Sequence, residues 1–194
     1  FANNKKTLII ADNIARLYAL DLRDGKLLWS INNSAPFNSQ IKIYKDRFFI
    51  IDFSNTLRCF SIANGEELWN IKTENSLIRS QKKLSMVIID QMIYFVNSVG
   101  DISAVDINEG ELIWQLPTQS TLLYESSFSL ENSDLISDGK NLFFSNNKNQ
   151  FFSVDIESGS FNWETKINSN LRPTVIDDII ISVSLEGYLV ILEK

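Results

Sequence analysis

Two features of the sequence could take part in chemistry: the single cysteine, Cys59, and the adjacent carboxylates Asp177 and Asp178. A reactive thiol needs surroundings that lower its pKa, and paired carboxylates can hold a metal ion or exchange protons. The chain contains no histidine, which removes the usual general base and the usual zinc ligand. We therefore expect Cys59 to be a buried small hydrophobic residue and Asp177-Asp178 to form a solvated hairpin turn. A reactive thiol and a metal site are the alternatives.

The composition is that of an acidic globular protein. Of the 194 residues, 44% are hydrophobic and 22% are charged, and the formal net charge is −6. This apolar fraction suffices for a core, whereas a negative net charge argues against general nucleic-acid binding, which needs a basic surface. No apolar run approaches the length of a membrane span. A membrane-spanning segment is therefore not expected within these residues.

Four segments of eleven residues repeat one pattern, with a small residue, Asp or Ser, Gly and Trp at offsets 0, 2, 6 and 10. They are ALDLRDGKLLW (19–29), CFSIANGEELW (59–69), AVDINEGELIW (104–114) and SVDIESGSFNW (153–163), and they contain all four tryptophans. An internal repeat indicates a repeat architecture. Its residues are therefore interpreted first as structural and only then as chemical groups.

Each position of the repeat has a physical role. The Asp or Ser can accept backbone N–H bonds in a tight turn, and the glycine can adopt the positive φ that such a turn requires. We expect the tryptophan on an outermost strand, with its ring buried against the next repeat, and the small residue leaves room for that packing. The residues assigned to this motif are Ala19, Asp21, Gly25, Trp29, Cys59, Gly65, Trp69, Ala104, Asp106, Gly110, Trp114, Ser153, Asp155, Gly159 and Trp163.

Runs of β-branched and aromatic residues, separated by short turns, precede each motif and predict antiparallel strands. The stretches Ile41–Tyr44, Leu84–Ile89 and Thr174–Ile176 can each supply one further, inner strand. Four strands per repeat, at intervals of about 40–50 residues, are typical of the blades of a β-propeller. No segment has useful helical periodicity. The predicted fold is therefore all-β, a propeller of four-stranded antiparallel blades.

The blade count predicts an incomplete ring. The first unit is expected to begin at its second strand, Thr7–Ala11, and the last to stop at its third, YLVILEK. The units are approximately 1–33, 34–73, 74–117, 118–168 and 169–194 of one partial propeller, about four and a half blades. We expect this to be roughly half of an eight-bladed propeller. Its exposed sheet edges predict association with the missing N-terminal half or with a second copy.

The pattern A-x-D-x-x-x-G-x-x-x-W resembles the tryptophan-docking motif of the quinoprotein-like propellers, which include the pyrroloquinoline-quinone (PQQ) dehydrogenases. Ala19–Trp29, Ala104–Trp114 and Ser153–Trp163 match it well, whereas the second repeat departs from it at Ser61. The resemblance implies, for the enzymes, PQQ on a Ca²⁺ ion with Glu, Asn and Asp ligands, a vicinal disulfide and an aspartate base. One cysteine cannot form that disulfide. No catalytic, cofactor-binding or metal-binding residue is therefore assigned here, and no cofactor is expected.

Among family members without the quinone site, the chain is most similar to the BamB-type lipoproteins of the outer-membrane β-barrel assembly machinery. The resemblance implies a non-catalytic, protein-binding scaffold at the periplasmic face of the bacterial outer membrane. Its expected partner is a barrel-assembly protein. The alternatives are a fragment of a PQQ-dependent dehydrogenase and a ligand-sensing propeller domain.

Two connections, Thr73–Ser85 and Pro117–Leu135, are longer than blade connections need to be. Long loops on a rigid scaffold often carry binding surfaces. Their apolar and basic residues are the candidates for partner binding: Leu77, Ile78, Arg79, Leu122, Leu123 and Tyr124. The alternative is that both loops are ordinary variable insertions, part of each forming an inner strand.

Overall fold

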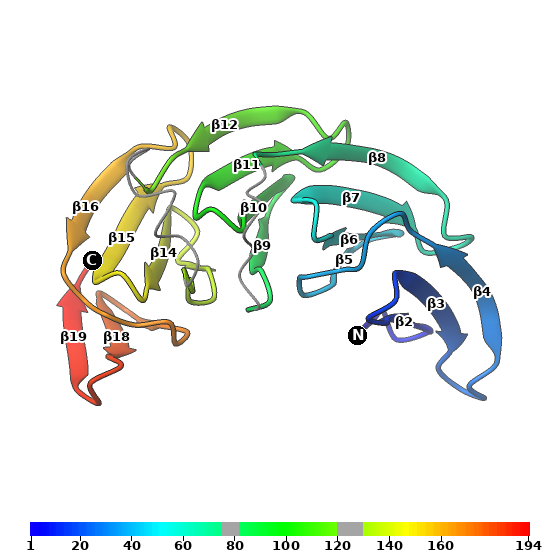
Figure 1. The fold of residues 1–194 in the computed structure, drawn as a ribbon, viewed down its shortest axis with the longest axis horizontal. Coiled ribbons are helices and arrows are strands. Elements are labelled where there is room, and N and C mark those ends of the chain that lie inside the picture. The colour runs from blue at the N-terminus through cyan, green and yellow to red at the C-terminus, as the bar shows by residue number, and fades with distance from the viewer. Residues whose placement is uncertain (75–81, 120–129) are drawn as a thin grey trace.

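A computed structural model describes residues 1–74, 82–119 and 130–194. In these ranges the chain forms the strands β1 to β19 and no helix. The strands make five separate antiparallel sheets, which stand side by side along an open arc (Figure 1). The predicted all-β propeller architecture is confirmed. Within the same ranges, no helix is long and apolar enough to cross a membrane.

Each sheet is a meander whose strands follow one another from the inner edge of the arc to its outer rim. The first contains β1 (Ala2–Asn3), β2 (Thr7–Ala11), β3 (Arg16–Asp21) and β4 (Leu27–Asn32). The second contains β5 (Lys42–Tyr44), β6 (Arg47–Ile51), β7 (Thr56–Ser61) and β8 (Glu67–Lys72). The third contains β9 (Met86–Ile89), β10 (Met92–Val96), β11 (Ile102–Asp106) and β12 (Leu112–Leu116).

The fourth sheet contains β13 (Ile136–Ser137), β14 (Asn141–Asn146), β15 (Gln150–Asp155) and β16 (Phe161–Thr165). The fifth has three strands, β17 (Thr174–Ile176), β18 (Ile179–Val183) and β19 (Leu189–Glu193). Among the described residues, no fourth strand pairs with β19 in this last sheet. Three of the predicted inner strands are present as β5, β9 and β17.

The first blade corrects one expectation. The sequence predicts no inner strand before Thr7–Ala11, yet Ala2–Asn3 forms β1 and pairs with β2 through Ala2 opposite Ile9. The physical reason is that inner strands need very few residues. The inner strand β13 also has only two residues, so two residues at the start of the chain suffice.

The core lies between the sheets rather than inside any one of them. Each of four hydrophobic clusters joins one blade to the next, and the cluster between the first two blades contains Ile9, Leu17, Phe48 and Phe60. Successive side chains of a strand point to opposite faces, and both faces of an inner blade are covered. Phe48 and its neighbour Phe49 are therefore both fully buried. This packing of blade on blade fixes where the turns and loops emerge.

Candidate functional site

In the first four blades, the turn between the third and the outer strand is held by a side-chain oxygen. Asp106 Oδ1 accepts hydrogen bonds from the backbone N–H groups of Asn108, at 2.8 Å, and Glu109, at 2.9 Å. In the second blade Ser61 takes this place, and its Oγ accepts one longer bond, 3.3 Å, from the N–H of Ala63. A hydroxyl can therefore replace the carboxylate, with weaker support for the turn.

The hydrogen bonds of these turns favour the ionised carboxylates. The hydrogen bond from the Arg23 side chain, followed by that from its backbone N–H, holds the pKa of Asp21 below its usual value. Bonds from the N–H and hydroxyl of Ser158 lower the pKa of Asp155 in the same way. Both carboxylates are therefore ionised near neutral pH and act as hydrogen-bond acceptors within their turns.

The motif glycines have φ angles of 70° at Gly25, 74° at Gly65, 73° at Gly110 and 67° at Gly159. These values lie in the left-handed region, which glycine enters without steric cost. A second constraint acts at the last three positions, where the tryptophan ring of the preceding blade lies directly over the backbone. A Cβ at Gly110 would lie only 2.5 Å from Cδ2 of Trp69.

Each of these rings also donates a hydrogen bond to the blade on which it packs. The indole N–H of Trp29 donates to the carbonyl of Ile62 at 2.8 Å, and that of Trp114 donates to the carbonyl of Ile156 at 3.1 Å. The indole of Trp69 bonds in the same way to the carbonyl of Ile107, at 3.3 Å. Packing over glycine and a directed hydrogen bond together fasten each blade to the next.

The four tryptophan rings are half-buried rather than fully enclosed. They stand on the outer strands, at the rim of the arc, where one side of the ring covers the neighbouring turn and the other meets solvent. Trp163 differs further, since the fifth sheet carries no motif turn. Its ring packs on Phe143 and Phe151 of its own blade, at centroid distances of 6.2 and 5.9 Å.

The small residues of the motif lie directly opposite the tryptophans in the same sheet. Ala19 pairs with Trp29 and Cys59 with Trp69, and both small side chains are fully buried; Ala104 and Ser153 are placed likewise. Burial raises the pKa of the Cys59 thiol to about 12. This thiol is protonated at neutral pH and lacks the surroundings that activate a nucleophile.

The adjacent carboxylates Asp177 and Asp178 lie in the turn between β17 and β18 and are exposed. Asp177 has a φ of 49°, and the carbonyl of Asp178 accepts a hydrogen bond from the N–H of Lys194. In the described ranges, no group of three His, Cys, Asp or Glu residues could hold a metal ion. The pair is thus placed as a solvated turn.

The quinone site of the family's enzymes does not fit these residues. Its disulfide would need two adjacent cysteines, whereas Cys59 is single and buried within β7. At the inner edge of the arc, the carboxylate of Asp134 lies beside the cations Lys42 and Arg172. Because a divalent cation would be repelled by these two side chains, this donor set is unsuited to Ca²⁺.

The candidate partner-binding residues Leu77, Ile78, Arg79, Leu122, Leu123 and Tyr124 lie outside the described residues. The beginnings of both loops are nevertheless fixed. Thr73 Oγ1 donates to the carbonyl of Asn55 at 3.1 Å, and Asn55 Nδ2 donates to the carbonyl of Glu74 at 2.6 Å. In the next blade, Thr118 Oγ1 donates to the carbonyl of Gly100 at 2.8 Å.

These anchors place both loops on the same face of the arc. Asn55 and Gly100 belong to the turns between the second and third strands of their blades. In an antiparallel meander, successive turns alternate between the two ends of the strands. The connection that leaves the outer strand therefore emerges beside this turn, at the end opposite to the tryptophan-motif turns. The described ends of the two long loops therefore lie on one face, and the motif turns occupy the other.

The far ends of the two loops meet at a third connection. The Lys82 ammonium donates to the carbonyl of Asn170, and the Asn170 amide donates to the Glu131 carboxylate. Asn170 lies between the fourth and fifth blades, so three connections are joined through one residue. Lys82, Glu131 and Asn170 were not among the residues predicted from the sequence, because each alone looks like an ordinary polar loop residue. The sequence feature that could have indicated them is the presence of polar residues on either side of each inner strand.

The comparisons with known proteins agree with this architecture. The family model described as outer membrane protein assembly factor BamB matches residues 1–194. BamB of Kangiella koreensis is 23% identical over 194 residues, which cover 92% of this chain and 46% of that protein. The dehydrogenase subunit of the alcohol dehydrogenase (quinone) of Gluconobacter oxydans is 25% identical over 183 residues, 88% of this chain and 20% of that protein.

Among solved structures, BamB from Moraxella catarrhalis has a TM-score of 0.82 at 19% identity, covering 97% of this chain and 58% of that one. A quinohemoprotein alcohol dehydrogenase from Pseudomonas putida HK5 has a TM-score of 0.72 at 12% identity, covering 98% of this chain and 39% of that one. These likenesses concern the fold. The chain spans less than half the length of the curated relatives described above. Because the family model covers all 194 residues, the chain belongs to the family described as outer membrane protein assembly factor BamB.

Proposed function

We propose that this chain is part of a non-catalytic, protein-binding scaffold that acts in the assembly of outer-membrane β-barrel proteins. Membership in the BamB family and the similarity to BamB of Kangiella koreensis support this role. The observation that carries the proposal is the placement of the two long loops. They leave neighbouring blades on one face, and hydrogen bonds fasten their ends to the blades.

This arrangement suits recognition of a protein. A segment that binds a partner loses conformational freedom, and a fixed pair of ends limits that loss to the residues between them. Leu77 and Ile78 in the first loop, with Leu122 and Leu123 in the second, are apolar residues that become buried on contact. The partner is a barrel-assembly protein, bound at the periplasmic face of the outer membrane.

The open arc completes its ring with the remainder of a longer propeller of roughly eight blades. The outer edge of β19 is the edge to be covered, because β19 lacks a fourth strand beside it within this chain. Its side chains Leu189 and Ile191 are 67% and 60% exposed. Attachment to the membrane occurs through a lipid anchor outside these residues.

The test is loss of the partner on changing the loops of the full-length protein. Two double variants, Leu77→Ser with Ile78→Ser and Leu122→Ser with Leu123→Ser, are co-purified with the barrel-assembly partner. The matched control is Leu27→Ser with Leu28→Ser, two leucines on the outer rim that are 57% and 52% exposed. The loop variants should lose the partner while the control retains it, with circular dichroism verifying the fold of each.

Retention of the partner by both folded loop variants would overturn this assignment of the interface. The relationship to the Gluconobacter oxydans dehydrogenase subunit favours a second function, a fragment of a PQQ-dependent dehydrogenase. Reconstitution of the full-length protein with PQQ and Ca²⁺, followed by a dye-reduction assay, separates the two. An active dehydrogenase would replace the scaffold by the enzyme.

A further inference from the structure

A polar cavity of about 180 Å³ lies at the inner edge of the arc. Its walls come from four successive blades: Gln40 and Lys42 from the second, Val87 from the third, Asp134 and Ile136 from the fourth, and Arg172 from the connection to the fifth. The innermost strands of these blades converge on the concave side (Figure 1). The cavity exceeds the roughly 30 Å³ share of one water molecule, so it has room for part of a ligand.

Positive charge in this cavity exceeds its negative charge. Lys42 is partly buried, and burial together with the neighbouring Arg172 lowers its pKa, while Asp134 acts in the opposite direction. Asp134 is already engaged, since its Oδ1 accepts a hydrogen bond from Gln40 Nε2 at 3.4 Å and its charge also acts on Lys82. The Asp134 carboxylate thus acts on Lys42 and Lys82 and lines the same cavity as a third cation, Arg172.

Two of those cations have unused hydrogen-bond donors. In the described parts of the chain, neither the Lys42 ammonium nor the Arg172 guanidinium makes a hydrogen bond or an ion pair. The two groups repel one another across the cavity, as the lowered pKa of Lys42 reflects. An anion placed between them would remove that repulsion and use both donors.

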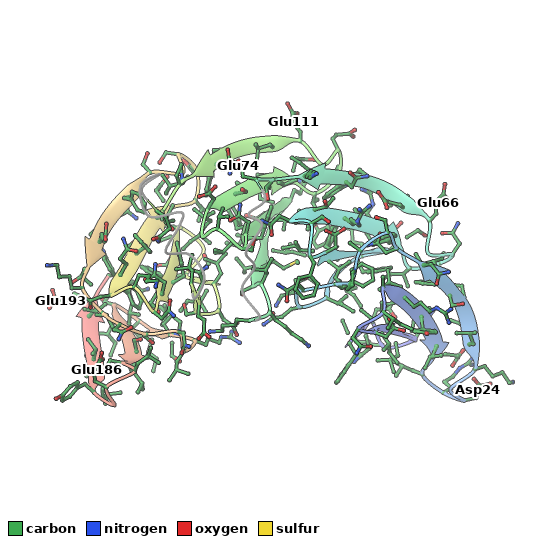
Figure 2. The ribbon with its side chains drawn as sticks, viewed as in Figure 1. Asp24, Glu66, Glu74, Glu111, Glu186 and Glu193 are labelled. Atoms are coloured by element: carbon green, nitrogen blue, oxygen red, sulfur yellow. The ribbon has the colours of Figure 1, made fainter. Side chains whose placement is uncertain are left out.

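The cationic cavity contrasts with the rest of an acidic molecule, whose net charge is −6. Figure 2 shows labelled carboxylates along the outer rim and at the two ends of the arc, at Asp24, Glu66, Glu111, Glu186 and Glu193. An approaching anion is therefore repelled from the rim and attracted to the concave edge. The positive charge is therefore confined to the cavity and differs from the net negative charge of the whole protein.

We propose that this cavity binds the carboxylate of an acidic side chain on a protein segment that enters the concave edge of the arc. Lys42 and Arg172 donate to the carboxylate, and Val87 and Ile136 contact the methylene groups of the same side chain. Asp134 restricts the ligand to a single negative charge, because a phosphate dianion would be repelled more strongly. The proposal rests on the proposed scaffold function only in taking a protein as the occupant.

Direct binding to an acidic peptide tests this. A fluorescein-labelled peptide of six glutamates is titrated with the full-length protein at low salt, and a six-glutamine peptide serves as the uncharged match. The Lys42→Gln/Arg172→Gln variant should weaken binding of the glutamate peptide about tenfold or more. The control variant Lys166→Gln/Arg23→Gln removes the same two charge types at exposed positions and should bind as the parent does. Asp134→Asn should bind more tightly, because it removes the competing carboxylate.

Competition identifies the source of the carboxylate. Free butyrate, which carries one carboxylate and two methylene groups, should displace the glutamate peptide at lower concentration than inorganic phosphate does. Failure of the glutamate peptide to bind, equal binding by all variants, or displacement by phosphate at the lower concentration would each overturn the proposal. The Leu77→Ser/Ile78→Ser variant should bind this peptide normally, so loss of the barrel-assembly partner and loss of the carboxylate site are distinguishable.

Discussion

The ring of Trp69 occupies the space in which a side chain at Gly110 would begin, with 2.5 Å between its Cδ2 atom and the position of a Cβ. The two residues belong to adjacent blades: Gly110 lies in the motif turn of the third blade, and Trp69 lies on the outer strand of the second. The same glycine therefore permits both the turn conformation and the packing of the two blades. Gly25 has a similar φ, 70° against 73°, but no atom within 4 Å of its Cβ position. A substitution at Gly25 therefore reports backbone strain alone, whereas the same substitution at Gly110 reports backbone strain together with packing.

Gly110→Ala should destabilise the protein more than Gly25→Ala does. Both changes place alanine in the left-handed region, at a cost of roughly 1–2 kcal/mol. Only Gly110→Ala also displaces a tryptophan ring, which adds about 1–3 kcal/mol as in other overpacked sites. Urea unfolding of both variants measures the difference. Equal loss of stability would mean that the ring moves aside without cost.

Trp114→Ala should lower the free energy of unfolding by about 3 kcal/mol, the lower end for removal of a large aromatic side chain, because the ring is partly exposed. Trp114→Phe keeps an aromatic ring but loses the hydrogen bond to Ile156, at 3.1 Å, and should cost about 1 kcal/mol from that bond. Trp163→Ala should cost less than Trp114→Ala, since Trp163 covers no motif glycine. Thermal melting compares the three, and a larger effect at Trp163 would contradict the docking account.

The buried carboxyl of Asp101 should make the fold less stable as the pH rises. Burial raises its pKa, against the hydrogen bond from Gln115, and its Oδ1 has no hydrogen-bond partner. The folded state then holds a proton that the unfolded state releases near its ordinary pKa of 3.8. Stability from this group is present below that pH and is lost as the pH rises through the higher folded pKa. Asp101→Asn should therefore raise the urea midpoint at pH 7.

Asp155 provides the comparison of opposite sign. Hydrogen bonds from Ser158 lower its pKa, so its contribution to stability is present above the ordinary value and is lost as the pH falls through the lower folded pKa. Asp155→Asn should lower the urea midpoint at pH 7. Midpoints that move in the same direction in the two variants would contradict the opposite signs of the two shifts.

Cys59 should be unreactive in the folded protein. Its thiol is fully buried, and its pKa of about 12 leaves it protonated. A thiol-specific chromogenic reagent should therefore react only after denaturant is added, at the rate of global unfolding. Cys59→Ala should cost no more than about 1 kcal/mol, because alanine occupies the equivalent positions 19 and 104. Rapid labelling under native conditions would contradict the burial.

The sequence predicts the blades well because the information for them is local. Asp106, Gly110 and Trp114 lie within eleven residues, and the turn and strands that they specify lie in one blade. The inner strands were harder to predict. A strand of two residues, such as Ala2–Asn3, has no periodicity to detect; its pairing with β2 depends on the sheet around it.

The cavity could not be predicted, for a different reason. Gln40 and Asp134 are 94 residues apart, and their hydrogen bond exists only because the blades curve around a common axis. Each of these residues alone resembles an ordinary polar residue at a strand end. Only the position of Arg172, also far away in sequence, shows that positive charge gathers there.

The docking of tryptophans has a direction, and this direction matters while the chain is being made. Three of the four rings pack on a glycine of the following blade: Trp29 on Gly65, Trp69 on Gly110 and Trp114 on Gly159. A ribosome releases the donor first and the acceptor about 40 residues later. The tryptophan on the outer strand of a newly made blade therefore has no glycine to pack on until the next blade has left the exit tunnel. During synthesis the blades would pack on one another in order from the N-terminal side. The exposed tryptophan of the most recently made blade would then be the one accessible to chaperones.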